Sequence, residues 1–155
     1  MLLYLLRHAD ADTVAESDDA RCLSEKGLAQ AKKVARFCEA HDVVPALILS
    51  SPLRRAHETA LIVSAKLRAE LVVEPWLASG MNPERALEEL RGHRKHESVM
   101  IVGHEPDFSR LAAHALGLPG EDRITLRKAA LTLLDLESFR PGGARLQFSL
   151  PCRLM

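Results

Sequence analysis

The sequence predicts an α/β fold with a mainly parallel sheet and one antiparallel edge strand. Apolar runs of strand length alternate with helix-length amphipathic segments, as is typical of helices packed on a parallel sheet. Near the end of the chain, two apolar segments flank a Pro-Gly-Gly turn, which indicates an antiparallel hairpin. No repeat, low-complexity tract or linker interrupts residues 1–155, so we expect a single domain.

Six apolar runs are the expected strands. They lie at Leu2–Leu6, Ala46–Leu49, Leu71–Val73, Val99–Val102, Leu131–Leu136 and Ala144–Leu150. The first run reaches Arg7 too soon for a signal peptide or a membrane span, so we interpret it as a buried strand. The last two runs are joined by Pro141-Gly142-Gly143 and form the expected hairpin.

Capping residues and apolar spacing predict four helices between these strands. Ser24 is a suitable N-cap for the first, and Ser51-Pro52 places a capping hydroxyl before a proline at the first helical position of the second. The four ranges are about 25–40, Ser51-Pro52 to about Leu67, Pro83 to about His93, and Pro106 to a terminator at Leu118-Pro119-Gly120.

Composition excludes several functions. The 155 residues hold 21 Lys+Arg and 21 Asp+Glu, so no net field favours nucleic acid or an anionic membrane. The 47% of hydrophobic residues describe a soluble domain with one core. Cys22, Cys38 and Cys152 are odd in number and lack zinc-site spacing. We therefore expect a reduced, cytoplasmic protein without a structural metal or a cofactor.

Unusual side chains follow three of the predicted strands. Arg7 and His8 end the first, Arg54 and Arg55 follow the second, and His104 follows the fourth. Ligands of open α/β sheets bind beyond the carboxyl ends of the strands, so two histidines and two arginines are expected to converge there.

A helical wheel separates the two adjacent arginines. At about 100° per residue, the apolar side chains of the second helix define a core face that Arg54 points away from. Arg55 lies on the flank of that face, one turn before Thr59. Arg55 is therefore the arginine expected to reach the site, while Arg54 faces water.

The convergent groups suit a phosphoryl group. Planar guanidinium groups and the free N–H groups of helix starts near Pro52 and Pro106 can bind several oxygens at once. A neutral imidazole is a competent nucleophile near pH 7, and arginines can stabilise the charge of the transition state without a metal ion. His93 and His96 are better explained as a cationic helix end than as metal ligands.

Four ordered motifs together resemble the histidine phosphatase superfamily, also called phosphoglycerate mutase-like. They are Arg7-His8-Ala9, Leu23-Ser24-x-x-Gly27, Ser51-Pro52-x-x-Arg55-Ala56-x-x-Thr59 and Val102-Gly103-His104. The chain is more narrowly similar to short bacterial SixA-type phosphohistidine phosphatases. The resemblance covers nearly the whole length and implies a three-layer αβα fold.

The resemblance also implies the roles of the four residues. His8 corresponds to the nucleophile that becomes transiently phosphorylated, and Arg7, Arg55 and His104 correspond to residues that complete the phosphate pocket. Ser51 and Thr59 match motif positions that we expect to shape the helix start rather than to act in catalysis.

One departure from the family pattern concerns the leaving group. Many members carry an acidic general acid after the third strand, where this chain has Trp76. An imidazole leaving from a phosphoramidate needs a proton less than an alkoxide does, so the departure favours an N-phosphorylated substrate. Loop carboxylates remain as candidate acids, namely Asp10, Asp12, Asp18, Asp19, Glu105 and Asp107.

The expected function is dephosphorylation of phosphohistidine on a signalling protein, such as a histidine phosphotransfer domain. Little chain lies between Leu77 and Val99 from which to build a lid, and an open pocket suits a protein substrate. Two alternatives stay open: a phosphatase of small phosphomonoesters, which needs one of the loop carboxylates as acid, and a phospho-ligand binding module without turnover. The oligomeric state is not predicted.

Overall fold

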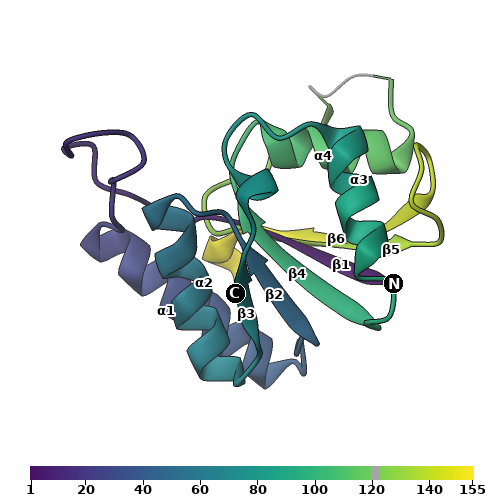
Figure 1. The fold of residues 1–155 in the computed structure, drawn as a ribbon. Coiled ribbons are helices and arrows are strands. Elements are labelled where there is room, and N and C mark those ends of the chain that lie inside the picture. Colours follow the sequence, from purple (N-terminus) through teal and green to yellow (C-terminus); the bar gives the residue numbers. More distant parts are fainter. Residues whose placement is uncertain (120–122) are drawn as a thin grey trace.

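A computed structural model describes residues 1–119 and 123–155, in which six strands and four helices form three layers (Figure 1). The strands are β1 (Leu2–Arg7), β2 (Leu47–Ser50), β3 (Leu71–Val73), β4 (Ser98–Gly103), β5 (Leu131–Leu136) and β6 (Ala144–Leu150). The helices are α1 (Glu25–Ala40), α2 (Arg54–Leu67), α3 (Pro83–Gly92) and α4 (Asp107–Leu116), with short 3-10 turns η1 (Pro75–Leu77) and η3 (Cys152–Leu154). The predicted α/β class and the six strands are confirmed.

The strands form one mixed sheet in the order β3-β2-β4-β1-β5-β6. β1, β2, β3 and β4 pair in parallel, whereas β5 is antiparallel to both β1 and β6. The single antiparallel strand was therefore predicted correctly, but its position at the edge was wrong. β5 occupies the free side of β1, so the tight turn after it returns β6 along the outer side of β5, and β6 becomes the edge.

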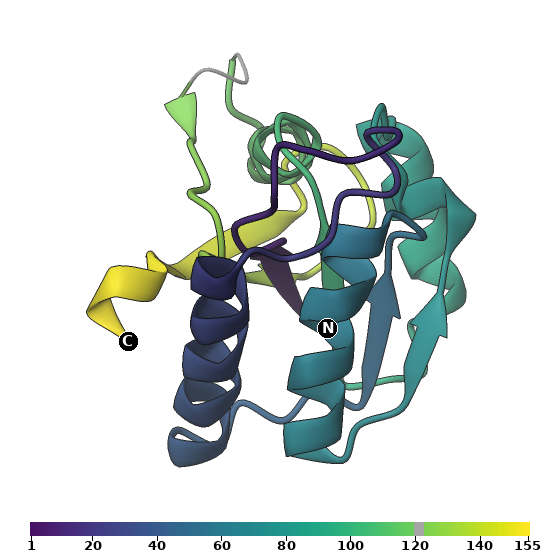
Figure 2. The same cartoon turned by 90° about the vertical axis from the view of Figure 1, so that its left-hand side faces the viewer.

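The two faces of the sheet are covered by different helix pairs. α1 and α2 pack on one face and α3 and α4 on the other, as Figures 1 and 2 show. Each pair encloses its own apolar cluster, one around Leu6, Val34 and Val102, the other around Leu5, Leu90 and Phe108. None of the helices in the described ranges has the length and apolar character needed to cross a bilayer.

Two predicted helix boundaries differ from the structure. α2 begins at Arg54 rather than at Pro52, because the Ser51 hydroxyl accepts a hydrogen bond from the Leu53 backbone N–H (3.2 Å) before the helix starts. α4 ends at Leu116, since Gly117 adopts a left-handed conformation (φ +69°) that stops the helix. The predicted terminator was placed one residue later, and its Gly120 lies outside the described residues.

The Leu23-Ser24-x-x-Gly27 element joins the start of α1 to the segment after β1. The Ser24 hydroxyl donates to the Asp10 carboxylate (2.7 Å) and accepts from the Gly27 N–H (3.1 Å). The backbone carbonyl of Asp10 lies so close to Gly27 that a Cβ atom has no room there. This contact fixes the chain two residues beyond His8.

We predict that Gly27→Ala lowers the free energy of unfolding by about 1–3 kcal/mol, because the added methyl group must push the Asp10 carbonyl aside. Urea denaturation measures the effect. Gly92→Ala in α3 is the matched control, since open space surrounds a Cβ at that position. The control should leave stability unchanged or raise it; an equal loss in both variants would contradict the close-approach explanation.

Candidate active site

Strand register brings the predicted side chains together at one edge of the sheet. β1 and β4 are parallel neighbours with Arg7 opposite Gly103, so His8 and His104 leave the sheet side by side. The His8 N–H donates to the Gly103 carbonyl (2.9 Å), and the two imidazole rings lie 5.2 Å apart between centroids. β2 pairs with the other side of β4 and delivers Ser51 next to them.

His8 is buried and its orientation is fixed. Only 7% of the residue is exposed, and its Nδ1 lies 2.7 Å from the carbonyl oxygen of Ala9. A carbonyl can only accept, so Nδ1 carries the proton and Nε2 keeps its lone pair. The Ala9 N–H donates to the Thr59 hydroxyl (3.1 Å), which in turn donates to the Arg55 carbonyl (2.7 Å). Thr59 thus joins the segment that follows His8 to α2.

His104 is buried against Ser51. Its Nε2 lies 2.7 Å from the Ser51 hydroxyl oxygen, which already accepts from the Leu53 N–H. When the hydroxyl hydrogen points at Nε2, the proton of the neutral ring lies on Nδ1. That buried Nδ1 has no hydrogen-bond partner among the described residues. An N–H group in this state is available to an incoming oxygen atom.

The two arginines are both anchored. Arg7 is half-buried and donates through Nη1 to the Leu126 carbonyl (2.7 Å), while its buried Nε has no partner in the described part of the chain. Arg55 is only 5% exposed, and its two terminal nitrogens donate to Asp18, one to the carbonyl (2.7 Å) and one to the carboxylate (3.0 Å). Arg54 is exposed, as the helical wheel predicted, and it forms an ion pair with Glu58.

Burial and positive charge keep both imidazoles neutral. Removal from water, together with the charges of Arg55, Arg7 and Lys128, lowers the pKa of His8 to about 4, although the hydrogen bond to Ala9 acts in the opposite direction. The pKa of His104 falls to about 3, again mainly through burial, with contributions from His8 and Arg55. Near pH 7 the site therefore holds two neutral rings beside two cations.

Several backbone N–H groups at the starts of α2 and α4 have acceptors within the protein. The Arg54 N–H of α2 donates to the Asp19 carbonyl (3.1 Å). In the first turn of α4, the Phe108 N–H donates to the His104 carbonyl (3.0 Å) and the Ser109 N–H to the Glu105 carboxylate (3.3 Å). These N–H groups have protein acceptors, and the cations that act on His8 are the side chains of Arg55, Arg7 and Lys128.

Four of the candidate acids have structural partners. Glu105 accepts from Ser109 and the Leu126 N–H, and Asp107 accepts from the Gly80 N–H. Hydrogen bonds from Lys128 and Ser24 lower the pKa of Asp10, while Arg21 and Arg55 lower that of Asp18. A general acid requires the opposite shift.

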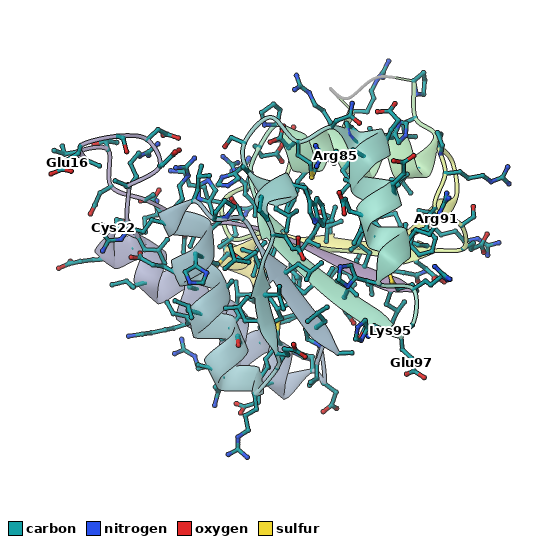
Figure 3. The ribbon with its side chains drawn as sticks, in the orientation of Figure 1. Glu16, Cys22, Arg85, Arg91, Lys95 and Glu97 are labelled. Carbon is teal, nitrogen blue, oxygen red and sulfur yellow. The ribbon has the colours of Figure 1, made fainter. Side chains whose placement is uncertain are left out.

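Of these four acids, Asp18 in the 10–22 loop is the one that bonds to Arg55. Figure 3 shows Glu16 and Cys22 on this loop, well away from Lys95 and Glu97 at the amino-terminal end of β4. The Asp18 carboxylate occupies the guanidinium fork that a phosphoryl group needs, so it must move when a phosphoryl group binds Arg55.

Other predicted features lie elsewhere. His93 and His96 follow α3 at the amino-terminal end of the sheet and contact each other rather than the site. In residues 1–119 and 123–155, no group of three or more His, Cys, Asp or Glu side chains is arranged to hold a metal ion. Trp76 lies in η1 after β3, half-buried, as the position after the third strand implied.

Sequence reasoning missed three contributors: the hydroxyl of Ser51 on His104, the Asp18 contact to Arg55, and the charge of Lys128 near His8. The Ser51-Pro52 motif was a signal for the first, although we assigned it to helix capping. The other two depend on how loops fold back on the sheet, and no local pattern indicates that.

Comparisons with known proteins agree with this geometry. Residues 3–79 match the family profile of the histidine phosphatase superfamily (branch 1). An uncharacterized protein of Picosynechococcus sp. is 34% identical over 95% of this chain and 89% of its own length. The phosphohistidine phosphatase SixA of Escherichia coli is 27% identical over 99% of this chain and 96% of its length. A solved structure of the protein histidine phosphatase SixA with tungstate superposes with a TM-score of 0.88 at 25% identity, covering 100% of both chains.

Acidification should destabilise the fold before it charges the two buried rings. We expect the ring nitrogens of His8 and His104 to keep neutral NMR shifts down to pH 5, with the His8 proton on Nδ1. Between pH 6.5 and about 4 the unfolded chain binds protons that the folded chain does not, so the free energy of unfolding should fall as the pH falls. Titration of either ring near pH 6.5 would contradict the burial argument.

Removal of the Ser51 hydroxyl should disturb the tautomer of His104. We predict that Ser51→Ala lowers kcat about tenfold or more with a smaller change in KM, because Nδ1 is no longer held as a donor. Nitrogen NMR of the His104 ring reports the tautomer directly. Ser50→Ala removes an equally buried hydroxyl that donates to the Ser51 carbonyl, and this control should retain activity and the wild-type ring shifts.

Proposed function

Because the chain belongs to the histidine phosphatase superfamily and is a phosphatase, we propose that it hydrolyses phosphohistidine on a signalling protein through a phosphorylated His8. The partner we propose is a histidine phosphotransfer domain. We further propose that the reaction is metal-independent and takes place in the cytoplasm.

The observation that carries the proposal is the state of His8. Its neutral ring is held by the Ala9 carbonyl, so that the lone pair of Nε2 is free to attack phosphorus. A freely titrating histidine near pH 6.5 gives a less uniform population of this form. Burial and nearby cations therefore favour a nucleophile rather than an acid.

The proposed reaction has two displacements. In the first, the Nε2 lone pair of His8 forms a bond to phosphorus while the P–N bond of the substrate breaks, and the substrate imidazole takes up a proton from water. In the second, the oxygen of a water molecule forms a bond to the phosphorus on His8 while the P–Nε2 bond breaks, the proton lost by that water passes to solvent, and inorganic phosphate leaves as Nε2 regains its lone pair. Arg7, Arg55 and the Nδ1–H group of His104 stabilise the oxygens in both steps.

The carboxylates around the site support an N-phosphate substrate. Asp10 and Asp18 have lowered pKa values and stay ionised, and Glu105 and Asp107 accept hydrogen bonds from the protein. Trp76 follows β3 and offers no proton suited to an alkoxide. An imidazole leaving group depends less on such an acid. The named activity and the bound oxyanion of the similar SixA proteins are consistent with this choice.

We predict that the wild-type protein releases phosphate from a phosphorylated histidine phosphotransfer domain faster than from para-nitrophenyl phosphate, with or without EDTA. His8→Ala should lose at least about a thousandfold in kcat, because it lacks the nucleophile. Arg55→Ala should weaken activity strongly, while Arg54→Ala on the exposed face of α2 is the matched control and should retain it.

Two outcomes would contradict parts of this proposal. Turnover of the phenyl ester alone, abolished by replacing one loop carboxylate, would identify a phosphatase of small phosphomonoesters. Tight phosphate binding without turnover of either substrate would identify a phospho-ligand binding module.

A further inference from the structure

A basic hollow adjoins Arg7. It has a volume of about 440 Å³ and is formed by α1, the 126–130 segment and the C-terminal turn η3. Figure 2 shows η3 on one side of α1 and the 10–22 loop above α2 on the other. Five of the eight lining residues are cationic: Arg7, Lys26, Arg127, Lys128 and Arg153.

The charge of this hollow is only partly neutralised, by the ion pair of Lys128 with Asp10. Its remaining lining residues are Gln30, Pro151 and Cys152, so no carboxylate lines it. Outside residues 120–122, no ion pair joins the exposed side chains of Lys26, Arg127 or Arg153 to an acidic group. Since the whole chain has a net charge of zero, this concentration of cations is a local asymmetry.

The hollow shares Arg7 with the proposed phosphate pocket. The Ala129 N–H donates to the carbonyls of Arg7 (3.1 Å) and His8 (3.2 Å). The charge of Lys128 contributes to the lowered pKa of His8, so its electric field reaches the nucleophile. An anion bound in the hollow would therefore lie beside the reacting phosphoryl group.

One wall of the hollow is rigid. The Lys128 ammonium lies 2.6 Å from the Asp10 carboxylate, which also accepts from Ser24. The Asp10 N–H donates to the Gln30 side chain (2.8 Å), which lines the hollow from α1. This network places Lys128, whereas Lys26, Arg127 and Arg153 project from the rim.

We propose that the basic hollow binds carboxylates on the surface of the phosphorylated partner, next to its phosphohistidine. This inference rests on the proposed function and names the chemistry of the partner surface. Exposed lysines and arginines around a hollow fit several carboxylates of a protein face by charge complementarity. A small metabolite would need a cradle of buried polar groups, and apart from Arg7 and Lys128 the cations here are exposed.

Acidic side chains on the opposite flank of the site restrict the orientation in which the partner can bind. In the 10–22 loop, residues 12–19 are exposed and hold four acidic residues and no basic one. Cations thus lie on one side of the phosphate pocket and acidic groups on the other. A partner with acidic side chains on one side of its phosphohistidine can dock in only one favourable direction.

The test uses phosphohistidine peptides of equal length flanked by Glu, Ser or Lys, together with free phosphohistidine. At low salt the wild type should show a kcat/KM for the Glu peptide about five- to thirtyfold above that for the Ser peptide, and salt should reduce the preference. The double charge reversal Arg127→Glu/Arg153→Glu should abolish it and favour the Lys peptide. Activity on free phosphohistidine should change less than twofold, because both residues are exposed rim residues.

The matched control is Arg94→Glu/Lys95→Glu, which changes the net charge equally at the far end of the sheet and should keep the wild-type preference (Figure 3). Equal turnover of all three peptides by the wild type would overturn the inference while the proposed function stands. So would an equal loss of preference in the control. No turnover of any phosphohistidine compound, with para-nitrophenyl phosphate still hydrolysed, would overturn the proposed function itself.

Discussion

The parallel pairing of β1 with β4 is the constraint on which the site depends. With Arg7 opposite Gly103, the next residue of each strand is a histidine, and the two rings leave the sheet at the same edge. A shift of one residue in this register would place His8 and His104 at different heights. It would also move the side chains of the shifted strand to the opposite face of the sheet. The buried apolar residues on both faces of β1 and β4 prevent that shift. The same packing that stabilises the sheet therefore aligns the reactive groups.

Burial of the two imidazoles has a chemical consequence and a cost in stability. Each ring is kept neutral by removal from water and by neighbouring cations, which suits a nucleophile and a hydrogen-bond donor. Arg55 is held by Asp18 from the 10–22 loop, and Arg7 donates through Nη1 to the Leu126 carbonyl. The side chains are thus held in place without a ligand, and under the proposed function phosphate oxygens replace the Asp18 contact at Arg55.

Much of this arrangement could be predicted from local patterns, and the rest could not for identifiable reasons. Apolar runs located all six strands, and residues just beyond them located His8, Arg55 and His104. The edge position of β6 depends on the placement of the hairpin beside β1, with β5 next to that strand. Tertiary packing determines this placement, and local sequence patterns do not. Ser51 was interpreted as a helix cap because its sequence neighbours fit that role, yet its hydroxyl faces His104 across the sheet edge. The positions of Asp18 and Lys128 follow from long-range loop packing.

The measurement that tests the central claim most directly is a crystal structure of the protein with vanadate, which mimics phosphorus in the transition state. The geometry at His8 predicts vanadium at bonding distance from Nε2, with oxygens bound by Arg7, Arg55 and Nδ1 of His104, and with Asp18 withdrawn from Arg55. Vanadate bonded to another residue, or seated in the pocket without a bond to His8, would contradict His8 as the nucleophile.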